Sequence, residues 1–334
     1  MRSGILAGGN WIVDRVKLID TWPAQDALAS ILSEAPGNGG SAYNLLKNLA
    51  ILGADFPLEA AGLVGGDTDG RAILADCARH RIDTTQLRPR PGATTSYTDV
   101  MTVRGTGRRT FFHQRGANAL LDGGDFDFTR TRAKLFHLGY LLLLDRLDEI
   151  VGNRPRAVDL LARARGAGLT TSVDCVSEAG DRFQRHILPV LPEVDVLFAN
   201  DFETEKITGL SLTRAGTVDR LAVETAARRL IALGVRAWAV VHFPEAVCAC
   251  AASGECVWQP SVAMPSALIA GAAGAGDALA AGVVFGWHDG RSMKECLRYG
   301  VCAAAASLSH ASCSDGVRSL PECLALGERL GFRT

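Results

Sequence analysis

Short apolar segments alternate along the chain with longer segments whose apolar positions recur at helical spacing. The predicted strands are residues 3–7, 58–64, 169–174, 194–199 and 236–241. The predicted helices are residues 41–52, 68–80, 221–233, 274–288 and 292–307, two of which are followed by glycine. Strands that alternate with helices are typical of a mostly parallel sheet covered by helices. The pattern therefore predicts an α/β fold.

One region departs from this order. Residues 96–103 and 109–113 alternate polar and apolar side chains around a basic, glycine-rich stretch, which predicts a β-hairpin. Residues 13–19 alternate in the same way and can join the hairpin in a small separate sheet. Because Asp14 and the flanking segments carry groups that bind ligands, we interpret this sheet as a lid. An ordinary antiparallel edge is the alternative.

The length and composition are sufficient for one large core, since the 334 residues are 48% hydrophobic and 21% charged. Neither an internal repeat nor a low-complexity linker divides the sequence. We therefore expect a single domain over residues 1–334, with lid strands near 12–20 and 95–113.

The formal net charge of −1 gives no electrostatic footprint for nucleic acid or an anionic membrane. No apolar run reaches the roughly 18 residues of a spanning helix, and the start is too short for a signal peptide. We therefore expect a cytoplasmic protein that binds neither nucleic acid nor membrane. The nine cysteines form no CxxC pair, and we interpret Cys248 and Cys250 as small buried hydrophobes rather than metal ligands.

The stretch Gly271-Ala272-Ala273-Gly274-Ala275-Gly276-Asp277 carries the clearest chemistry of the chain. It precedes an apolar helical segment, and the free amides of a helix N-terminus attract anions such as phosphate. Glycines admit an anion to those amides, and a carboxylate beside it can take a proton from an attacking hydroxyl. The stretch indicates a phosphoryl-transfer site, although a tightly packed helix start is an alternative interpretation.

Five motifs resemble, in order, those of the ribokinase-like (PfkB-type) family of sugar and nucleoside kinases. They are GGSAYN at 39–44 with LG at 52–53, VGGDTDG at 64–70, GAN at 116–118, NDFE at 200–203 and GAGD at 274–277. Together they cover nearly the whole chain. The resemblance implies a ribokinase-like three-layer sandwich, with a mostly parallel central sheet and a small β-sheet lid.

The resemblance also implies which residues bind the sugar. They are Asp14, Gly39, Gly40, Asn44 and Asn118. Glycines bring the backbone close to a polyol, and carboxylate or amide groups can hold neighbouring hydroxyls. A solvated asparagine in a helical turn and a charged residue on a lid face are the alternatives for Asn44 and Asp14.

For the nucleotide, the resemblance implies contacts from Asn200, His242, Gly274 and Gly276, with Glu203 supporting Mg²⁺ through water. The spacing of Asn200 and Glu203 also fits a helix capping box, and both roles can coexist.

Asp277 then becomes the catalytic base, and the amides of Ala275, Gly276 and Asp277 stabilise the transferring phosphoryl group. Two positions depart from the family pattern. Gly271-Ala272 replaces the usual Asp-Thr, which makes activation by K⁺ doubtful, and His242-Phe243-Pro244 replaces a phosphate-binding turn.

The sequence therefore predicts an ATP- and Mg²⁺-dependent kinase that phosphorylates a hydroxyl, expected to be primary, on a sugar or sugar-like substrate. A nucleoside kinase is one alternative, with Trp11, Tyr43 and Phe112 as an aromatic wall. A catalytically silent sugar-binding protein is another. The resemblance also suggests a homodimer formed through the lid.

Overall fold

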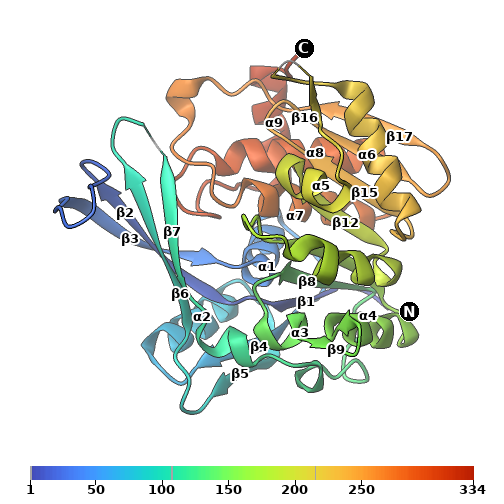
Figure 1. Ribbon diagram of the computed structural model, residues 1–334, viewed down its shortest axis with the longest axis horizontal. Coiled ribbons are helices and arrows are strands. Elements are labelled where there is room, and N and C mark those ends of the chain that lie inside the picture. Colours follow the sequence, from blue (N-terminus) through green and yellow to red (C-terminus); the bar gives the residue numbers. More distant parts are fainter. Residues whose placement is uncertain (1, 107, 215) are drawn as a thin grey trace.

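The computed structural model describes residues 2–106, 108–214 and 216–334. Within these ranges nine strands form one central sheet in the order β17-β16-β15-β12-β11-β8-β1-β4-β5 (Figure 1). From β15 to β5 the neighbouring strands are parallel, whereas β16 and β17 are antiparallel to their neighbours. The strands are β1 (Ile5–Gly9), β4 (Leu58–Gly65), β5 (Asp83–Arg90), β8 (Leu135–Leu141), β11 (Thr170–Cys175), β12 (Val196–Asn200), β15 (Trp238–His242), β16 (Ala246–Ala251) and β17 (Cys256–Pro260).

Helices cover both faces of this sheet because its buried strands are apolar on both sides. Successive residues of β1 show the alternation, since Ile5 belongs to one hydrophobic core and Leu6 to the other. The first core contains residues of α1 (Ser41–Leu52), α2 (Thr68–Arg79), α7 (Ala275–His288), α8 (Met293–Ser307) and α9 (Leu320–Leu330). The second contains residues of α4 (Ala157–Gly166), α5 (Asp201–Thr208) and α6 (Arg220–Ala232). The result is a three-layer sandwich.

The chain also forms a short helix, α3 (Asp145–Asp148), and several two-residue strands. These strands are β9 (Ile150–Val151), β10 (Arg154–Pro155), β13 (Thr213–Arg214) and β14 (Thr217–Val218).

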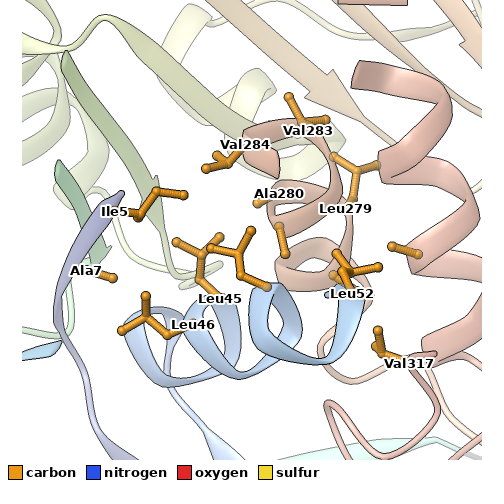
Figure 2. Close-up of a cluster of buried hydrophobic side chains, with 14 of the residues drawn as sticks. Ile5, Ala7, Leu45, Leu46, Leu52, Leu279, Ala280, Val283, Val284 and Val317 are labelled. Atoms are coloured by element: carbon orange, nitrogen blue, oxygen red, sulfur yellow. The ribbon is translucent and has the colours of Figure 1, made fainter. Parts of the chain in front are cut away.

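Helix α1 packs directly against α7 in the first core (Figure 2). Leu45 and Leu52 of α1 point toward the part of α7 that carries Leu279 and Ala280, and all four side chains are buried. Truncating one such leucine to alanine typically costs about 2–5 kcal/mol of stability. This contact fixes the start of α7 relative to α1, and both helices carry motif residues.

A second, four-stranded sheet has the order β3-β2-β6-β7 and projects from the body at the left of Figure 1. We call it the small sheet; its strands are β2 (Ile12–Ile19), β3 (Ile31–Gly39), β6 (Ser96–Val103) and β7 (Arg109–Gln114). The hairpin and the strand near residue 13 lie where the sequence predicts them. The sequence analysis did not predict β3, whose Pro36, Gly37 and exposed positions resemble a loop.

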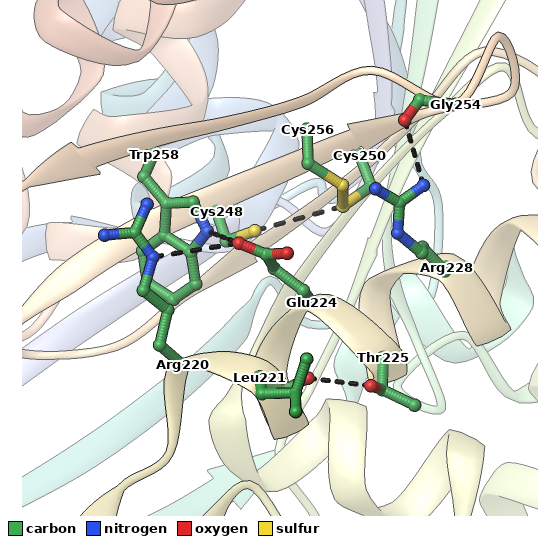
Figure 3. The surroundings of a disulfide bond; sticks show 10 residues. All are labelled: Arg220, Leu221, Glu224, Thr225, Arg228, Cys248, Cys250, Gly254, Cys256 and Trp258. Carbon is green, nitrogen blue, oxygen red and sulfur yellow. Dashed lines mark hydrogen bonds and ion pairs between the residues drawn. A yellow bond between two sulfur atoms is a disulfide. The ribbon is translucent and has the colours of Figure 1, made fainter.

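One expectation about the cysteines is wrong. Cys250 does not serve as a free apolar residue, because it forms a disulfide with Cys256 (Figure 3). The antiparallel register of β16 and β17 sets these two residues directly opposite each other. Cys248 remains a buried thiol, with its Sγ 4.0 Å from Sγ of Cys250.

The predicted fold class is confirmed by the sheet order and the helix layers. The predicted elements lie within about two residues of the observed ones. Of the helices in the described ranges, none combines the length and hydropathy needed to cross a bilayer.

Candidate active site

A cavity of about 740 Å³ opens at the carboxyl ends of the parallel strands, the edge where open α/β sheets bind ligands. Strands β8, β11, β12 and β15 each bring a polar residue to it near their last position. The small sheet and the first turn of α7 form other parts of its wall. Polar side chains in the wall include Asp14, Asn44, Thr98, His113, Tyr140, Asp174, Ser177, Asn200, Glu203, His242 and Asp277.

Helix α7 presents its first turn to this cavity. Gly274 precedes the helix with a φ of 75°, and a Cβ there would lie 2.6 Å from Cβ of Cys313. Ala275, Gly276 and Asp277 follow and also line the cavity. Because the first amides of a helix have no partner within the helix, they provide N–H donors for an anion. The carboxyl of Asp277 therefore lies beside an anion-binding turn.

Asp277 is buried and is held by two neighbours from distant parts of the chain. Asn44 Nδ2 donates to Asp277 Oδ2 at 2.8 Å, and the Tyr140 hydroxyl lies 2.8 Å from both carboxyl oxygens. Burial raises the pKa of Asp277 to about 7, and the charge of Asp174 adds to the rise. The carboxyl thus changes its protonation state close to neutral pH.

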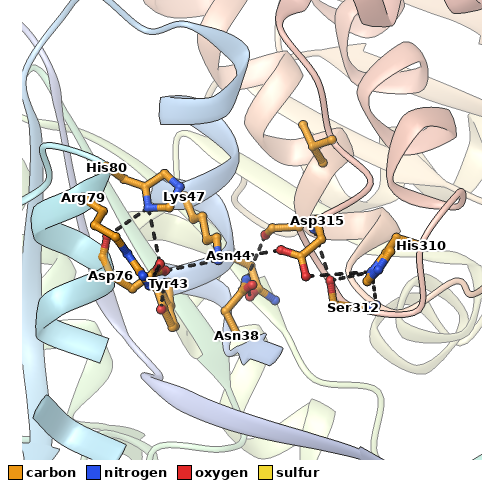
Figure 4. A network of polar contacts seen from close by, with 12 residues as sticks. Asn38, Tyr43, Asn44, Lys47, Asp76, Arg79, His80, His310, Ser312 and Asp315 are labelled. Atoms are coloured by element: carbon orange, nitrogen blue, oxygen red, sulfur yellow. Dashed lines mark hydrogen bonds and ion pairs between the residues drawn. The ribbon is translucent and has the colours of Figure 1, made fainter. Parts of the chain in front are cut away.

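A polar network fixes Asn44 against the loop that follows α8 (Figure 4). Asn38 Nδ2 donates to Asn44 Oδ1 at 2.6 Å and lies 2.8 Å from Ser314 Oγ. One turn further along α1, Lys47 Nζ is 4.0 Å from a carboxylate oxygen of Asp315. The side chain of Asn44 is therefore oriented with its amide NH₂ toward Asp277.

The small sheet contributes a row of three side chains in register across its strands. Asp14 pairs with Thr98, which pairs with His113, and all three line the cavity. Gly39 leaves room for Asp14, because a Cβ at Gly39 would lie 2.3 Å from Asp14 Oδ1. Cys313 Sγ donates to Asp14 Oδ2 at 3.6 Å from the opposite side. Burial raises the pKa of Asp14 to about 7.

His113 presents one free nitrogen to this region. Its Nδ1 lies 3.0 Å from Thr98 Oγ1, while its buried Nε2 has no hydrogen-bond partner in the described chain. Burial lowers the pKa of His113 to about 4, so the ring is neutral near pH 7. Gly40, in the same loop as Gly39, also lines the cavity.

Asn200 and Glu203 form the capping box that their spacing allows, and both also line the cavity. Asn200 Oδ1 accepts from the Glu203 amide at 2.8 Å, and Glu203 Oε2 accepts from the Asn200 amide at 3.0 Å. Ser177 Oγ donates to the other oxygen, Oε1, at 2.7 Å. Burial raises the pKa of Glu203 to about 7. The capping box is therefore formed by residues that also lie in the cavity wall.

His242 lies opposite Asn200 in the register of β12 and β15, with its ring against Gly276. A Cβ at Gly276 would be 3.2 Å from Cε1 of His242. Burial lowers the pKa of His242 to about 4, which makes it a neutral donor or acceptor. Phe243 and Pro244 follow it in the cavity wall.

A buried network lies behind the cavity. Ser41 Oγ donates to Asp174 Oδ2 at 2.8 Å and lies 2.8 Å from Nε2 of His137. The other ring nitrogen of His137 is 2.8 Å from Ser172 Oγ. His137 is fully buried with both ring nitrogens engaged by serine hydroxyls, so neither nitrogen is free for a ligand in the cavity.

Two groups of predicted residues are not brought to the cavity. Asn118 is fully buried, where its Oδ1 accepts from the Trp11 amide and its Nδ2 donates to the Trp11 carbonyl. It holds the chain that leads into β2 and does not reach a substrate.

The three residues predicted to form an aromatic wall for a nucleoside base do not line the cavity. Trp11 and Tyr43 stack on each other in the core, and Phe112 stacks on Trp22 outside the cavity. The aromatic side chain that the small sheet places in the cavity wall is Phe111.

The sequence analysis missed the contacts that Tyr140 and Cys313 make with Asp277 and Asp14. Each is a lone residue in an apolar or serine-rich stretch, without a local motif. A strand ending near Tyr140 would have been a signal for that residue, but residues 135–141 were not predicted as a strand.

The residues fit a Mg²⁺ ion held mainly by nucleotide and water. Glu203 provides a buried carboxyl in the cavity wall, whose pKa is raised by burial and, to a smaller extent, by the charge of Asp174. In the described ranges, no three His, Cys, Asp or Glu side chains converge as a complete metal site. Mg²⁺ usually takes one or two carboxylates and completes its shell with phosphate oxygens and waters, which this arrangement allows.

A sequence profile of the pfkB family of carbohydrate kinases matches residues 16–320. The chain belongs to this family. The match covers most of the chain and most of the cavity wall, and the lining residues Ile12, Asp14 and Arg333 lie outside it.

Relatives of the pfkB chain are similar over nearly its whole length. The ATP-dependent ribose-1-phosphate kinase of Halopiger xanaduensis is 27% identical over 98% of this chain and 98% of its own. The ribokinase of Thermotoga maritima superposes with a TM-score of 0.78 at 17% identity, covering 98% of this chain and 100% of its own. The ribokinase of Arabidopsis thaliana, solved with ribose and ATP, superposes with a TM-score of 0.76 at 19% identity over 98% and 99% of the two chains.

Proposed function

We propose that this pfkB chain transfers the γ-phosphoryl group of ATP to a primary hydroxyl of a sugar or sugar-like substrate, with Asp277 as general base. The observation that carries the proposal is the position of Asp277. Its buried carboxyl faces the cavity from the first turn of α7, beside the first amides of that helix. A base next to an anion-binding turn is what phosphoryl transfer to a hydroxyl requires.

In this mechanism the sugar lies between Asn44 and the row of Asp14, Thr98 and His113. Carboxylate, amide and imidazole groups can each hold sugar hydroxyls. Gly39 supports this row because its missing side chain leaves room for Asp14, and Gly40 lies in the cavity wall. The reacting hydroxyl gives its proton to Asp277 as its oxygen attacks the phosphorus.

The amides of Ala275, Gly276 and Asp277 would stabilise the charge on the transferred phosphoryl group. Asn200 and His242, which line the same cavity, would contact the nucleotide phosphates. Glu203 would hold a Mg²⁺ ion, which neutralises phosphate charge when bound. The small sheet would cover the site as a lid and exclude water, which limits hydrolysis of ATP.

For the sugar itself, we propose a phosphorylated pentose such as ribose 1-phosphate as the first substrate to test. The relative from Halopiger xanaduensis is named as a kinase of ribose 1-phosphate. On β7, Arg109 alternates with Phe111 and His113, both in the cavity wall, so its side chain leaves the sheet on the same face. Burial lowers the pKa of Arg109, and Cys313, which lines the cavity, is the titratable residue that interacts with it. A partly desolvated guanidinium can bind a phosphate group.

A nucleoside kinase of the same fold is the second candidate. It is favoured by Phe111, an aromatic ring that lines the cavity and could stack on a base. A silent binding protein would keep the cavity without turnover.

The experiment that separates these functions is a phosphorylation screen with ATP and Mg²⁺. Pentoses, hexoses, ribose 1-phosphate, keto-deoxy sugar acids and nucleosides are each incubated with the protein, and products are identified by mass spectrometry. NMR of the product then assigns the phosphorylated hydroxyl. We expect a sugar product; a nucleotide product supports the second candidate, and binding without any product supports the silent protein.

We further propose that two copies associate through the small sheet. Large apolar side chains are exposed there, with Ile31 53% and Phe111 59% accessible. Clustered exposed apolar groups mark interaction surfaces.

A further inference from the structure

The hydroxyl of Tyr140 donates a hydrogen bond to the carboxyl of Asp277. It is 2.8 Å from Oδ1 and 2.8 Å from Oδ2, so one donor bridges both oxygens. The backbone holds the tyrosine in place, because its amide donates to Oδ1 of the fully buried Asn10. Asn10 Nδ2 in turn donates to the carbonyl of Leu143 at 3.2 Å.

The bonds around Asp277 are not symmetric. Oδ2 accepts from both Asn44 and Tyr140, whereas Tyr140 is the donor to Oδ1. Because each carboxylate oxygen accepts about two hydrogen bonds, Oδ2 is filled and Oδ1 keeps one lone pair for a new donor. A substrate hydroxyl that enters the cavity can therefore bond to Oδ1.

We propose that Tyr140 is a positioning residue for the base: together with Asn44 it holds the Asp277 carboxylate, directs the substrate hydroxyl to Oδ1 and stabilises the ionised form. The inference rests on the proposed function, in which Asp277 accepts the proton. It goes further by assigning the proton to one oxygen and by giving a role to a residue outside the family motifs.

Charge balance in the site supports this role. Burial raises the pKa of Tyr140 well above its usual value, with further contributions from Asp277 and Asp174, so the hydroxyl remains a donor at working pH. The bonds from Asn44 and Tyr140 lower the pKa of Asp277, against burial and Asp174, which raise it. Loss of the hydroxyl should therefore raise this pKa further.

Other ionisable groups around Asp277 stay in place when only the tyrosine hydroxyl is removed. They are Asp14 on β2, His137 on β8, Asp174 on β11 and Cys313 after α8. A change in the titration of Asp277 can then be assigned to the hydroxyl.

The test is Tyr140→Phe, which keeps the ring. The pH dependence of kcat and kcat/KM is measured with the sugar found in the screen. We expect the acid limb of the profile to move up by about one pH unit, with kcat/KM reduced roughly tenfold more at pH 6 than at pH 9. KM should change less than kcat. Tyr43→Phe is the matched control, because the Tyr43 hydroxyl donates to Asp76 at 2.6 Å outside the cavity. It should leave the acid limb where it is.

A second readout does not need turnover. The side-chain carboxyl carbon of Asp277 is titrated by ¹³C NMR in the substrate-free protein, and its signal is assigned by its absence in Asp277→Asn. We expect a higher pKa in Tyr140→Phe than in the unmodified chain. If the screen finds no kinase activity, the proposed function fails, but this titration still decides whether Tyr140 stabilises the ionised carboxyl.

An equal pKa in both proteins, or a loss of kcat/KM that is the same at pH 6 and pH 9, overturns the inference. If Tyr140→Phe fails to fold, 3-fluorotyrosine at position 140 replaces it. The fluorinated hydroxyl is a stronger donor, so the pKa of Asp277 should fall; no change would count against the role of Tyr140.

Discussion

The proposed reaction of this pfkB chain depends on one buried carboxyl, that of Asp277. Replacement by asparagine keeps the size of the side chain and removes its ability to accept a proton. We expect Asp277→Asn to lower kcat by about 10²- to 10⁴-fold while KM changes little, since a general base contributes a factor of this size. Steady-state kinetics with the identified sugar measure both constants. Turnover equal to that of the unmodified chain would exclude Asp277 as the base.

The same substitution should affect stability in a pH-dependent way. The pKa of Asp277 is about 7 in the folded protein against an ordinary value of 3.8, because the group is buried. Between these values the folded protein holds a proton that the unfolded chain has lost, so this carboxyl reduces stability as pH rises from about 4 to 7. Asp277→Asn should therefore raise Tm more at pH 8 than at pH 4. Thermal unfolding at the two pH values provides the comparison.

At this scale the sequence identified residues that share a local motif, and it missed contacts between distant ones. Asp277 and Glu203 follow from short motifs at helix starts. Tyr140 lies 137 positions from Asp277, and only the fold brings them together. Asn118 shows that a motif residue can also be predicted for the wrong place. Its side chain forms hydrogen bonds with the backbone of Trp11 and lies outside the cavity.

Among the elements, strand β7 of the small sheet carries the proposed phosphate contact. Arg109→Gln keeps a polar side chain and removes the positive charge. We expect KM for ribose 1-phosphate to rise about 10- to 100-fold, because a charge-assisted hydrogen bond is lost, while KM for neutral ribose is unchanged. Arg104→Gln is the control, since Arg104 is an exposed residue of the same hairpin. Equal effects on both sugars would contradict a contact between Arg109 and phosphate.

The loop before α7 makes a prediction about monovalent cations. Gly271 stands where family members with a K⁺ site carry aspartate, and a Cβ here would lie 3.1 Å from both the Ala311 Cα and the His310 carbonyl oxygen. Gly271 therefore has no carboxylate to bind a cation, and the nearby backbone leaves little space for one. We expect equal rates, within about twofold, when Na⁺ replaces K⁺ at constant ionic strength. A marked increase with K⁺ would show that other groups bind the cation.

The elements that the sequence predicted are those with strong periodicity. The predicted strands and helices lie within about two residues of their observed positions, but the parallel strands β5 and β8 and the helices α4, α5 and α9 were not predicted. Strand β3 was not predicted because most of its side chains are exposed and because Pro36 and Gly37 interrupt the alternating pattern of a strand. Its pairing with β2 depends on the sheet as a whole. Likewise, Cys250 and Cys256 form a disulfide only because β16 and β17 pair in the register that opposes them.

For the whole molecule, the small sheet is both a wall of the cavity and an exposed apolar surface. Its cavity face bears Phe111, and its edge strand bears Ile31, while the body of the molecule covers little of either side chain. In a symmetric dimer the same patch lies on both copies, so one substitution acts twice. A sheet that closes one site and joins two copies would couple assembly to catalysis.

Ile31→Glu tests this arrangement. We expect the unmodified chain to sediment at about twice its mass of 35.3 kDa and the variant at 35.3 kDa, because a carboxylate in an apolar contact must be desolvated. Leu221→Glu is the control: Leu221 is 74% exposed on α6, away from the small sheet, and its replacement should leave the mass unchanged. If the unmodified chain sediments as a monomer at assay concentrations, the small sheet serves the site of its own copy alone. If only Ile31→Glu dissociates the dimer and its kcat/KM also falls, the partner's sheet contributes to the closed site.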